Sequence, residues 1–108
     1  DGMTLDKNKN LWVAHFHGDC VSVFNNKEKL IHRIRFPAKN ITNCAFGGKN
    51  TNELYVSTAT KGMNKADLQK FRYSGFFFSV KTNVKGILQK KFILNNEEKR
   101  SLLWENTY

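Results

Sequence analysis

The sequence predicts an all-β protein, and three observations support this. Short runs that alternate apolar and polar residues recur roughly every ten residues, with polar turns such as Asn25-Asn26-Lys27 between them. The second half of the chain repeats the first. The chain has 108 residues, 40% of them hydrophobic, which suits one domain with a modest but real core.

The first half contains four candidate strands. Residues 2–6 lead into a polar turn at 7–10, and residues 11–16 alternate before Gly18-Asp19 interrupts them. Residues 20–24 form a second apolar run, and residues 30–36 alternate again until Pro37 ends the pattern. We therefore expect one four-stranded antiparallel unit over about residues 1–37.

The second half repeats these signals with an insertion. Leu11-Trp12-Val13 matches Leu54-Tyr55-Val56 at an offset of 43, and residues 3–6 align loosely with residues 44–47. Downstream the offset becomes 57, because Ser22-Val23 matches Ser79-Val80 and Leu30-Ile31 matches Ile87-Leu88. The difference places an inserted loop near residues 60–74 and a second four-stranded unit at about residues 41–94.

Four short strands per repeat of about 43 residues are typical of a β-propeller blade. The chain is thus predicted to be a propeller fragment of two blades, residues 1–94. The alternative is a plain eight-stranded sandwich or barrel. In the tail, residues 95–108, Asn96 suits a helix cap and Glu97 a first turn, so we expect a short helix there, with the apolar residues 102–104 packing on the sheet.

The net charge of +9 does not by itself indicate a nucleic-acid partner. Lysines outnumber arginines by 14 to 4, are scattered singly and accompany no recognition motif, so solvated lysines are the better interpretation. An anion- or nucleic-acid-binding β domain stays a weaker alternative. No apolar run approaches the roughly 20 residues of a membrane-spanning helix, so no membrane partner is expected.

The two cysteines indicate no metal or redox centre. Cys20 and Cys44 lack the spacing of zinc and dithiol sites and lie in apolar runs, which predicts buried free thiols. Free thiols favour a reducing compartment, and we expect a cytoplasmic location. Because the sequence begins with Asp, we expect a processed, trimmed or partial chain.

An ordered series of motifs makes the sequence more specific. Over residues 1 to about 92 it resembles the C-terminal third of the regucalcin/gluconolactonase (senescence marker protein) family. The motifs, in order, are Asp1-Gly2-Met3, Asn10-Leu11-Trp12-Val13-Ala14, Phe36-Pro37-Ala38, Thr42-Asn43-Cys44-Ala45-Phe46-Gly47-Gly48, Leu54-Tyr55-Val56-Ser57-Thr58-Ala59, Gly62-Met63, Gly75-Phe76-Phe77-Phe78 and Val84-Lys85-Gly86.

This resemblance implies a six-bladed propeller that hydrolyses sugar lactones with a divalent metal, calcium or zinc, on its axis. The Asp of the family's Asp-Gly-Met motif, here Asp1, would be a metal ligand and a general base. The bound ion would polarise the lactone carbonyl and activate water. The family's other metal ligands, a Glu and an Asn, would lie upstream, so the ligand set in this chain is incomplete.

Other positions have two interpretations each. Thr42 and Asn43 occupy the place in the second blade that corresponds to Asp1-Gly2, so they would contact substrate or serve as a strand end. His15 and His17 are two apart on a predicted strand and would share a side, as metal ligands or as cover for a sheet face. Trp12 and Tyr55 are expected to pack in the core or between blades, and residues 76–78 to form a buried strand run.

Two blades cannot close a propeller, because each would expose an apolar face. The chain is therefore expected to pair with missing blades of a longer protein, to self-associate, for example as a trimer, or to refold compactly. Our leading hypothesis is the C-terminal part of a metal-dependent sugar-lactone hydrolase, not competent alone. The alternative is a non-catalytic, propeller-derived module that binds metal or protein.

Overall fold

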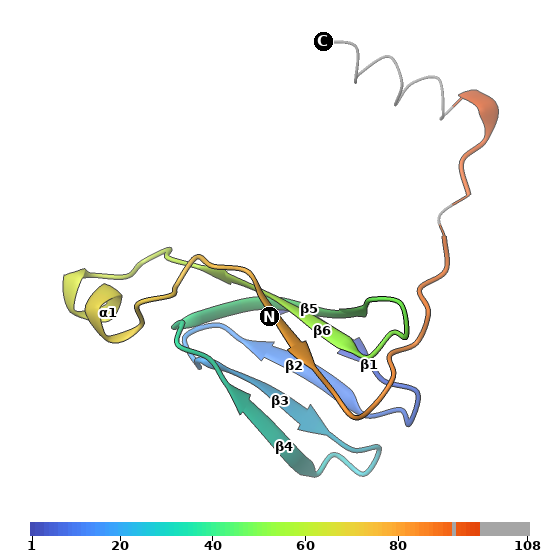
Figure 1. Ribbon diagram of the computed structural model, residues 1–108, viewed down its shortest axis with the longest axis horizontal. Coiled ribbons are helices and arrows are strands. Elements are labelled where there is room, and N and C mark those ends of the chain that lie inside the picture. The colour runs from blue at the N-terminus through green and yellow to red at the C-terminus, as the bar shows by residue number, and fades with distance from the viewer. Residues whose placement is uncertain (92, 98–108) are drawn as a thin grey trace.

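Two antiparallel sheets pack face to face in the computed structural model, which describes residues 1–91 and 93–97 (Figure 1). The first sheet has the order β1-β2-β3-β4 and the second the order β5-β6-β7. The strands are β1 (Met3–Leu5), β2 (Leu11–His15), β3 (Cys20–Phe24), β4 (Leu30–Arg35), β5 (Asn40–Gly47), β6 (Glu53–Ala59) and β7 (Phe78–Lys81). The mostly-β prediction is confirmed.

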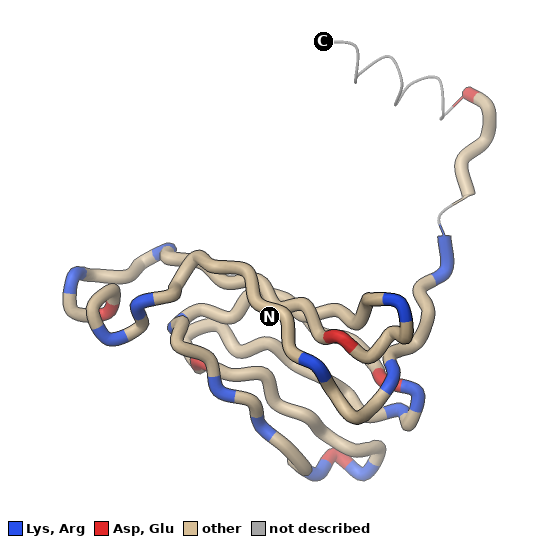
Figure 2. The backbone as a smooth tube through the Cα atoms, in the orientation of Figure 1, with Lys and Arg blue, Asp and Glu red and all other residues tan. Residues whose placement is uncertain are grey.

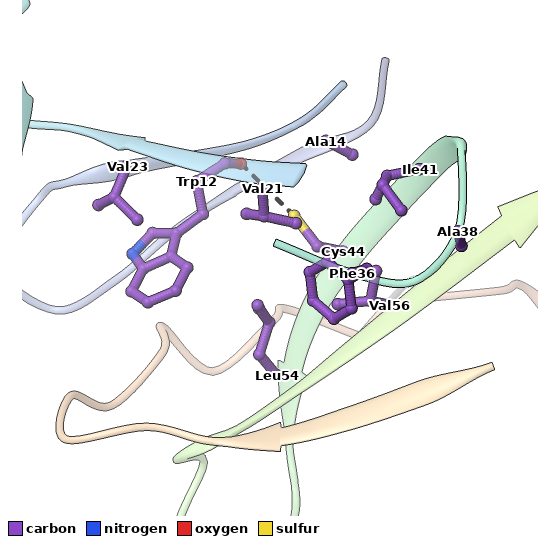
Figure 3. Packing of buried hydrophobic residues seen from close by; sticks show 10 residues of the cluster. All are labelled: Trp12, Ala14, Val21, Val23, Phe36, Ala38, Ile41, Cys44, Leu54 and Val56. Carbon is purple, nitrogen blue, oxygen red and sulfur yellow. Dashed lines mark hydrogen bonds between the residues drawn. The ribbon is translucent and has the colours of Figure 1, made fainter. Parts of the chain in front are cut away.

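The core lies between the sheets and follows the period-two alternation of the strands (Figure 3). Trp12 of β2 packs edge-on against Phe46 of β5, with ring centroids 5.0 Å apart. The Cys44 thiol of β5 donates to the Trp12 carbonyl oxygen across the same interface, at 3.5 Å. The buried cluster consists of Trp12, Ala14, Val21, Val23, Phe36, Ala38, Ile41, Cys44, Leu54 and Val56.

Each sheet also has an outer face, turned away from the other sheet. The first outer face is formed by Met3, Leu5, Leu11 and Val13, which pair with one another across β1 and β2. The second outer face is formed by Tyr55 and Ser57 of β6, Phe77 and Ser79. Met3 is 58% exposed and Phe77 is 69% exposed. Both faces therefore carry side chains that are open to solvent, although Ser22 of β3, which pairs with Val13 on the first outer face, is buried.

The second sheet has three strands within the described residues, where four were predicted. Beyond β7, Thr82 and Gly86 donate their backbone N–H groups to Asn52 and Thr51 in the β5–β6 turn. Gly86 also forms an isolated bridge with Asp6. The chain is thus held at one end of the sheet and then leads away from it (Figure 1), so Ile87 and Leu88 are exposed and lie in no strand.

The inserted loop contains a helix that the sequence reading missed, α1 (Lys65–Lys70). Asn64 and Asp67 form a capping box at its start. The Asp67 carboxylate also bonds Lys39 Nζ at 2.9 Å, which ties the helix to the turn between β4 and β5. The predicted buried run at residues 76–78 is wrong for its first two members, because Phe76 and Phe77 precede β7 and are exposed.

The remaining expectations concern the tail and the charges. Residues 98–108 lie outside the described residues. The helix predicted within residues 95–108 and the packing of residues 102–104 on the sheet therefore stay predictions. In Figure 2 the lysines and arginines lie mainly in turns, on β4 and around α1, while β1, β2, β3, β5 and β6 carry none. Among the described residues, no helix is long and apolar enough to cross a membrane.

Candidate functional site

The first two residues are fixed where the inner strands of the two sheets meet. Gly2 donates its N–H to the Thr42 carbonyl oxygen of β5 at 2.8 Å, and its own carbonyl accepts from Ala14 N–H of β2 at 2.8 Å. The amino group of Asp1 donates to the Ala14 carbonyl oxygen at 2.7 Å. Backbone contacts therefore hold Asp1 between β2 and β5, and Asp1 itself is exposed to solvent.

Glycine at position 2 is required by the close approach of β5. A Cβ atom built on Gly2 would lie 2.8 Å from Asn43 Cα and would also overlap the Asn43 side chain. Only a residue without a side chain allows the two strands to approach so closely. The structure thus brings together the three residues singled out from the sequence, Asp1, Thr42 and Asn43.

Thr42 and Asn43 have different surroundings. The Thr42 hydroxyl shares a hydrogen bond of 2.8 Å with the Ser57 hydroxyl of β6. Asn43 is exposed, and its Oδ1 accepts from Cys44 N–H at 2.9 Å, so the side-chain NH₂ group has no partner in the described chain. Beside Asn43 is a shallow hollow of about 140 Å³, whose other walls include Tyr55, Ser57 and Phe77. Ser57 and Tyr55 were not proposed as site residues from the sequence.

The described part of the chain does not by itself fit a metal ion. A hard divalent cation such as calcium takes about six to eight oxygen ligands. The described residues contain no group of three or more His, Cys, Asp or Glu side chains that could hold a metal. Asp1 supplies one carboxylate, and neutral oxygens of Thr42 and Asn43 are the other candidate donors nearby.

The expectation that His15 and His17 share one side of a strand is wrong. β2 ends at His15, and His17 lies in the following turn with a φ of 66°. The backbone N–H of His17 donates to Asn40 Oδ1 at 3.2 Å, and the His17 ring packs edge-on against Phe16. The turn separates the two imidazoles because the strand alternation stops before residue 17.

Asp6 is a buried carboxylate that the sequence reading left unremarked. It accepts hydrogen bonds from Asn8 N–H at 2.8 Å, Asn10 N–H at 3.0 Å, Asn10 Nδ2 at 3.1 Å and Trp12 Nε1 at 3.0 Å. Burial alone would raise the pKa of Asp6, but the bonds from Trp12, Asn10 and Asn8 outweigh it and hold the pKa below its ordinary value. The signal in the sequence is an Asp followed by a polar turn and a Trp six residues later. Its role is structural: it fixes the β1–β2 turn.

A second hollow, of about 440 Å³, has Asp6, Asn10 and Trp12 of the β1–β2 region among its walls. It opens between β4 and β7 and has Ile31, Ile34 and Val80 among its walls. The sheets are thus close together at β1 and β5 and diverge toward β4 and β7. This wedge arrangement is that of neighbouring blades around an axis.

The cysteines agree with the sequence prediction. Cys20 and Cys44 are both buried and free. Burial raises the pKa of the Cys44 thiol to about 11, which keeps it protonated near neutral pH.

Comparisons with known proteins agree with this geometry. Residues 1–60 match the family described as "SMP-30/Gluconolactonase/LRE-like region". The chain is 40% identical over 87 residues to the "Putative sugar lactone lactonase YvrE" of Bacillus subtilis, covering 80% of this chain and 30% of that protein. It is 39% identical over 89 residues to regucalcin of Danio rerio, again covering 30% of the relative. The chain thus spans about a third of the length of the curated relatives it matches.

Two solved structures share the fold. A regucalcin from Agrobacterium tumefaciens, titled a calcium-binding protein, superimposes with a TM-score of 0.81 at 24% identity, over 87% of this chain and 32% of the other. A luciferin-regenerating enzyme superimposes with a TM-score of 0.76 at 34% identity and the same coverage. The regucalcin is a six-bladed propeller, so the two sheets correspond to about a third of such a ring.

Proposed function

Because the chain belongs to the SMP-30/gluconolactonase/LRE-like family, we propose that it forms the C-terminal part of a metal-dependent sugar-lactone hydrolase. In this proposal Asp1 contributes one carboxylate to a divalent metal site, with calcium or zinc as the ion. The remaining ligands come from parts of the longer protein that this chain does not span. The chain alone is not competent for hydrolysis.

One observation carries the proposal. Asp1 is anchored at the junction of β1, β2 and β5, and the Gly2 contact places Asn43 and Thr42 beside it. A carboxylate near an amide and a hydroxyl can supply part of the oxygen ligands of a hard cation, and the same groups can hydrogen-bond a polyhydroxylated ligand. In the wedge formed by the sheets, this junction lies on the converging side, where an axial site would be.

Thr42 and Asn43 are proposed to contact the substrate. The free NH₂ group of Asn43 donates to a lactone hydroxyl or ring oxygen, while the Thr42–Ser57 pair offers a hydroxyl that can donate or accept. The wall formed by Tyr55 and Phe77 lies next to Asn43 and limits the hollow on its apolar side. The relative named a sugar lactone lactonase supports this substrate class.

A second candidate is a non-catalytic module that binds metal or another protein. The observation that favours its protein-binding form is the exposure of apolar side chains on the two outer faces, where Met3 is 58% and Phe77 is 69% exposed. The two candidates differ in whether the assembled site turns over a lactone.

A chimera tests the proposal. Residues 1–91 of this chain replace the matching part of the Bacillus subtilis relative, and hydrolysis of gluconolactone is followed with calcium, zinc, manganese or a chelator. We expect metal-dependent hydrolysis by the chimera and none by the 108-residue chain alone. A chimera that folds and binds metal but hydrolyses no sugar lactone would support the non-catalytic module instead. Hydrolysis that persists in the chelator would overturn the metal dependence.

A further inference from the structure

One edge of β7 is open. In the part of the chain that the structure describes, β7 is the last strand of its sheet, whereas the third strand of the first sheet pairs with a fourth. The Thr82 N–H donates to the Asn52 carbonyl oxygen, and bonded pairs alternate along an antiparallel ladder, so every second residue of β7 exchanges bonds with β6. The backbone N–H and C=O groups of Ser79 and Lys81 therefore point toward the open edge.

The larger hollow, of about 440 Å³, lies beside this edge. Val80 of β7 forms one wall, and Ile31 and Ile34 of β4 form another. Val80 and Ile34 pack against the core, while Ile31 is 50% exposed. Alternate side chains of a strand placed beside β7 would continue the row of Val80 and enter this hollow.

The residues that follow β7 leave this position empty. Bonds from Thr82 and Gly86 hold the chain at the β5–β6 turn, and residues 87–91 and 93–97 then lead away from the sheets (Figure 1). Ile87 and Leu88, which the repeat assigned to the fourth strand, are 44% and 79% exposed. The fourth position is thus open to a segment that comes from elsewhere.

The open edge of β4 has a different character. It carries His32, Arg33 and Arg35, and Pro37 follows the strand. Charged side chains and proline at an edge oppose pairing with another strand. In β7 (Phe78–Lys81), by contrast, Lys81 is the only charged residue. Of the two edges that flank the hollow, that of β7 is therefore the one suited to pairing.

We infer that an extended segment from the beginning of the longer protein adds to β7 as the fourth strand of this sheet. The inference rests on the proposed function only in that the chain is the C-terminal part of a longer protein. This chain spans 30% of its Bacillus subtilis relative, so ample chain lies outside it. In a closed ring like that of the superimposed regucalcin, the last sheet lies beside the first part of the chain.

The edge and the hollow specify the chemistry of this segment. Its backbone bonds Ser79 and Lys81, and it runs antiparallel to β7, as every neighbouring pair in both sheets does. Its alternate side chains are apolar, because they enter the hollow between Val80 and Ile34. A segment of the same polypeptide is favoured over a separate one, because the linkage raises its effective concentration at the edge.

Amide hydrogen exchange tests the inference on the chimera and on the 108-residue chain. We expect Ser79 and Lys81 to exchange at least about tenfold more slowly in the chimera, where their N–H groups are bonded, than in the chain alone. Arg33 is the matched control. The Phe36 N–H donates to the Asp19 carbonyl oxygen, so the alternation directs Arg33 N–H to the open edge of β4. Its exchange should be fast in both proteins.

A proline at the same position gives a second measurement. Proline is tolerated where the N–H faces solvent at an edge but not inside a sheet. We therefore expect Ser79→Pro to lower the urea midpoint of the chimera much more than that of the 108-residue chain. Arg33→Pro, on the edge that stays open, should have the same effect on both. Stepwise shortening of the chimera from its N-terminus should abolish the protection of Ser79 once its first strand is removed.

Three results would overturn the inference. They are equal exchange of Ser79 in the chimera and the 108-residue chain, protection that survives removal of the first strand, and a Ser79→Pro effect that is the same in both proteins. None of these measurements uses lactone hydrolysis. A protected Ser79 in an inactive chimera would contradict the proposed function alone, and an unprotected Ser79 in an active chimera would contradict this inference alone.

Discussion

Asp6 accepts four hydrogen bonds in a position from which solvent is excluded. Its donors come from the β1–β2 turn and from the Trp12 indole, so one carboxylate connects the turn to the core. Bonds to a charged acceptor are stronger than neutral ones, and their loss leaves buried donors without partners. Asp6 is therefore expected to contribute more to stability than an exposed carboxylate of the same type.

Replacement of Asp6 by Asn tests this. Asp6→Asn puts an NH₂ group where a donor now binds, and we expect it to lower the free energy of unfolding by about 3 kcal/mol. Asp19→Asn is the control, because Asp19 pairs with an Arg35 side chain that is 60% exposed, and such pairs contribute less than about 1 kcal/mol. Urea titration of both variants measures the difference, and equal effects would contradict the assignment.

The lowered pKa of Asp6 also predicts how stability depends on pH. The folded carboxyl has a pKa below its ordinary value of 3.8, so the unfolded chain binds more protons in this range. The stabilisation is complete well above pH 3.8 and is lost as the pH falls through 3.8 toward the folded-state pKa. Acid titration of wild type and Asp6→Asn should show a smaller pH dependence in the variant. Parallel acid titration curves would argue against this role.

Gly2 makes the junction at Asp1 sensitive to a single methyl group. We expect Gly2→Ala to destabilise the fold by about 1–3 kcal/mol, because the new Cβ meets both the side chain and the Cα of Asn43. In the Asn43→Ala background the cost should be smaller, since part of the overlap is removed. A double-mutant cycle by thermal unfolding measures this coupling. Strictly additive effects would mean that the two residues do not meet.

The grouping of Asp1, Thr42 and Asn43 could be predicted from the sequence because the repeat aligns the starts of the two inner strands. The hydroxyl pair of Thr42 with Ser57 could not, because it depends on the register of β5 with β6 and on the bulge between Ile41 and Asn43. His15 and His17 were misjudged for a related reason: alternation predicts sides only as far as the strand extends.

At the scale of elements, the first sheet was predictable and the second only partly. The first two strands of the first sheet alternate clearly between apolar and polar residues, and the turns in that sheet carry polar residues. The fourth strand predicted for the second sheet is not formed in the described residues, because hydrogen bonds from Thr82 and Gly86 to the β5–β6 turn redirect the chain. These are tertiary contacts, which the similarity between the two repeats does not reveal. The helix α1 was missed because it is short and has no buried residues, although Asn64 and Asp67 have the spacing of a capping box.

The stability of helix α1 depends mainly on the contacts of Asp67. Six residues are too few for a stable isolated helix, and Asp67 both caps the helix and binds Lys39, whose hydrogen bond lowers the pKa of that carboxyl. We expect Asp67→Ala to increase protease cleavage within residues 61–74 while leaving the sheets intact. Lys65→Ala, in the same helix, should leave the cleavage rate unchanged. Equal cleavage rates in wild type and Asp67→Ala would show that the helix is held by other contacts.

At the scale of the whole molecule, the wedge between the two sheets determines where the candidate site and the larger hollow lie. Its converging side brings Asp1 to the junction of β2 and β5, and its diverging side opens into the hollow between β4 and β7. Length and motif order in the sequence predicted a third of a propeller, and the family membership agrees. The sequence could not predict which faces stay exposed, because that depends on what lies beside each sheet.

The most direct test of this account is the rate of lactone hydrolysis in the chimera when Asp1 is changed. Asp1→Asn keeps the size of the side chain and the backbone contacts of residues 1 and 2, and Asp19→Asn is the matched control. The account predicts that Asp1→Asn lowers the metal-dependent rate by at least about a hundredfold while Asp19→Asn leaves it unchanged. An unchanged rate in Asp1→Asn would contradict the assignment of Asp1 as this chain's contribution to the site.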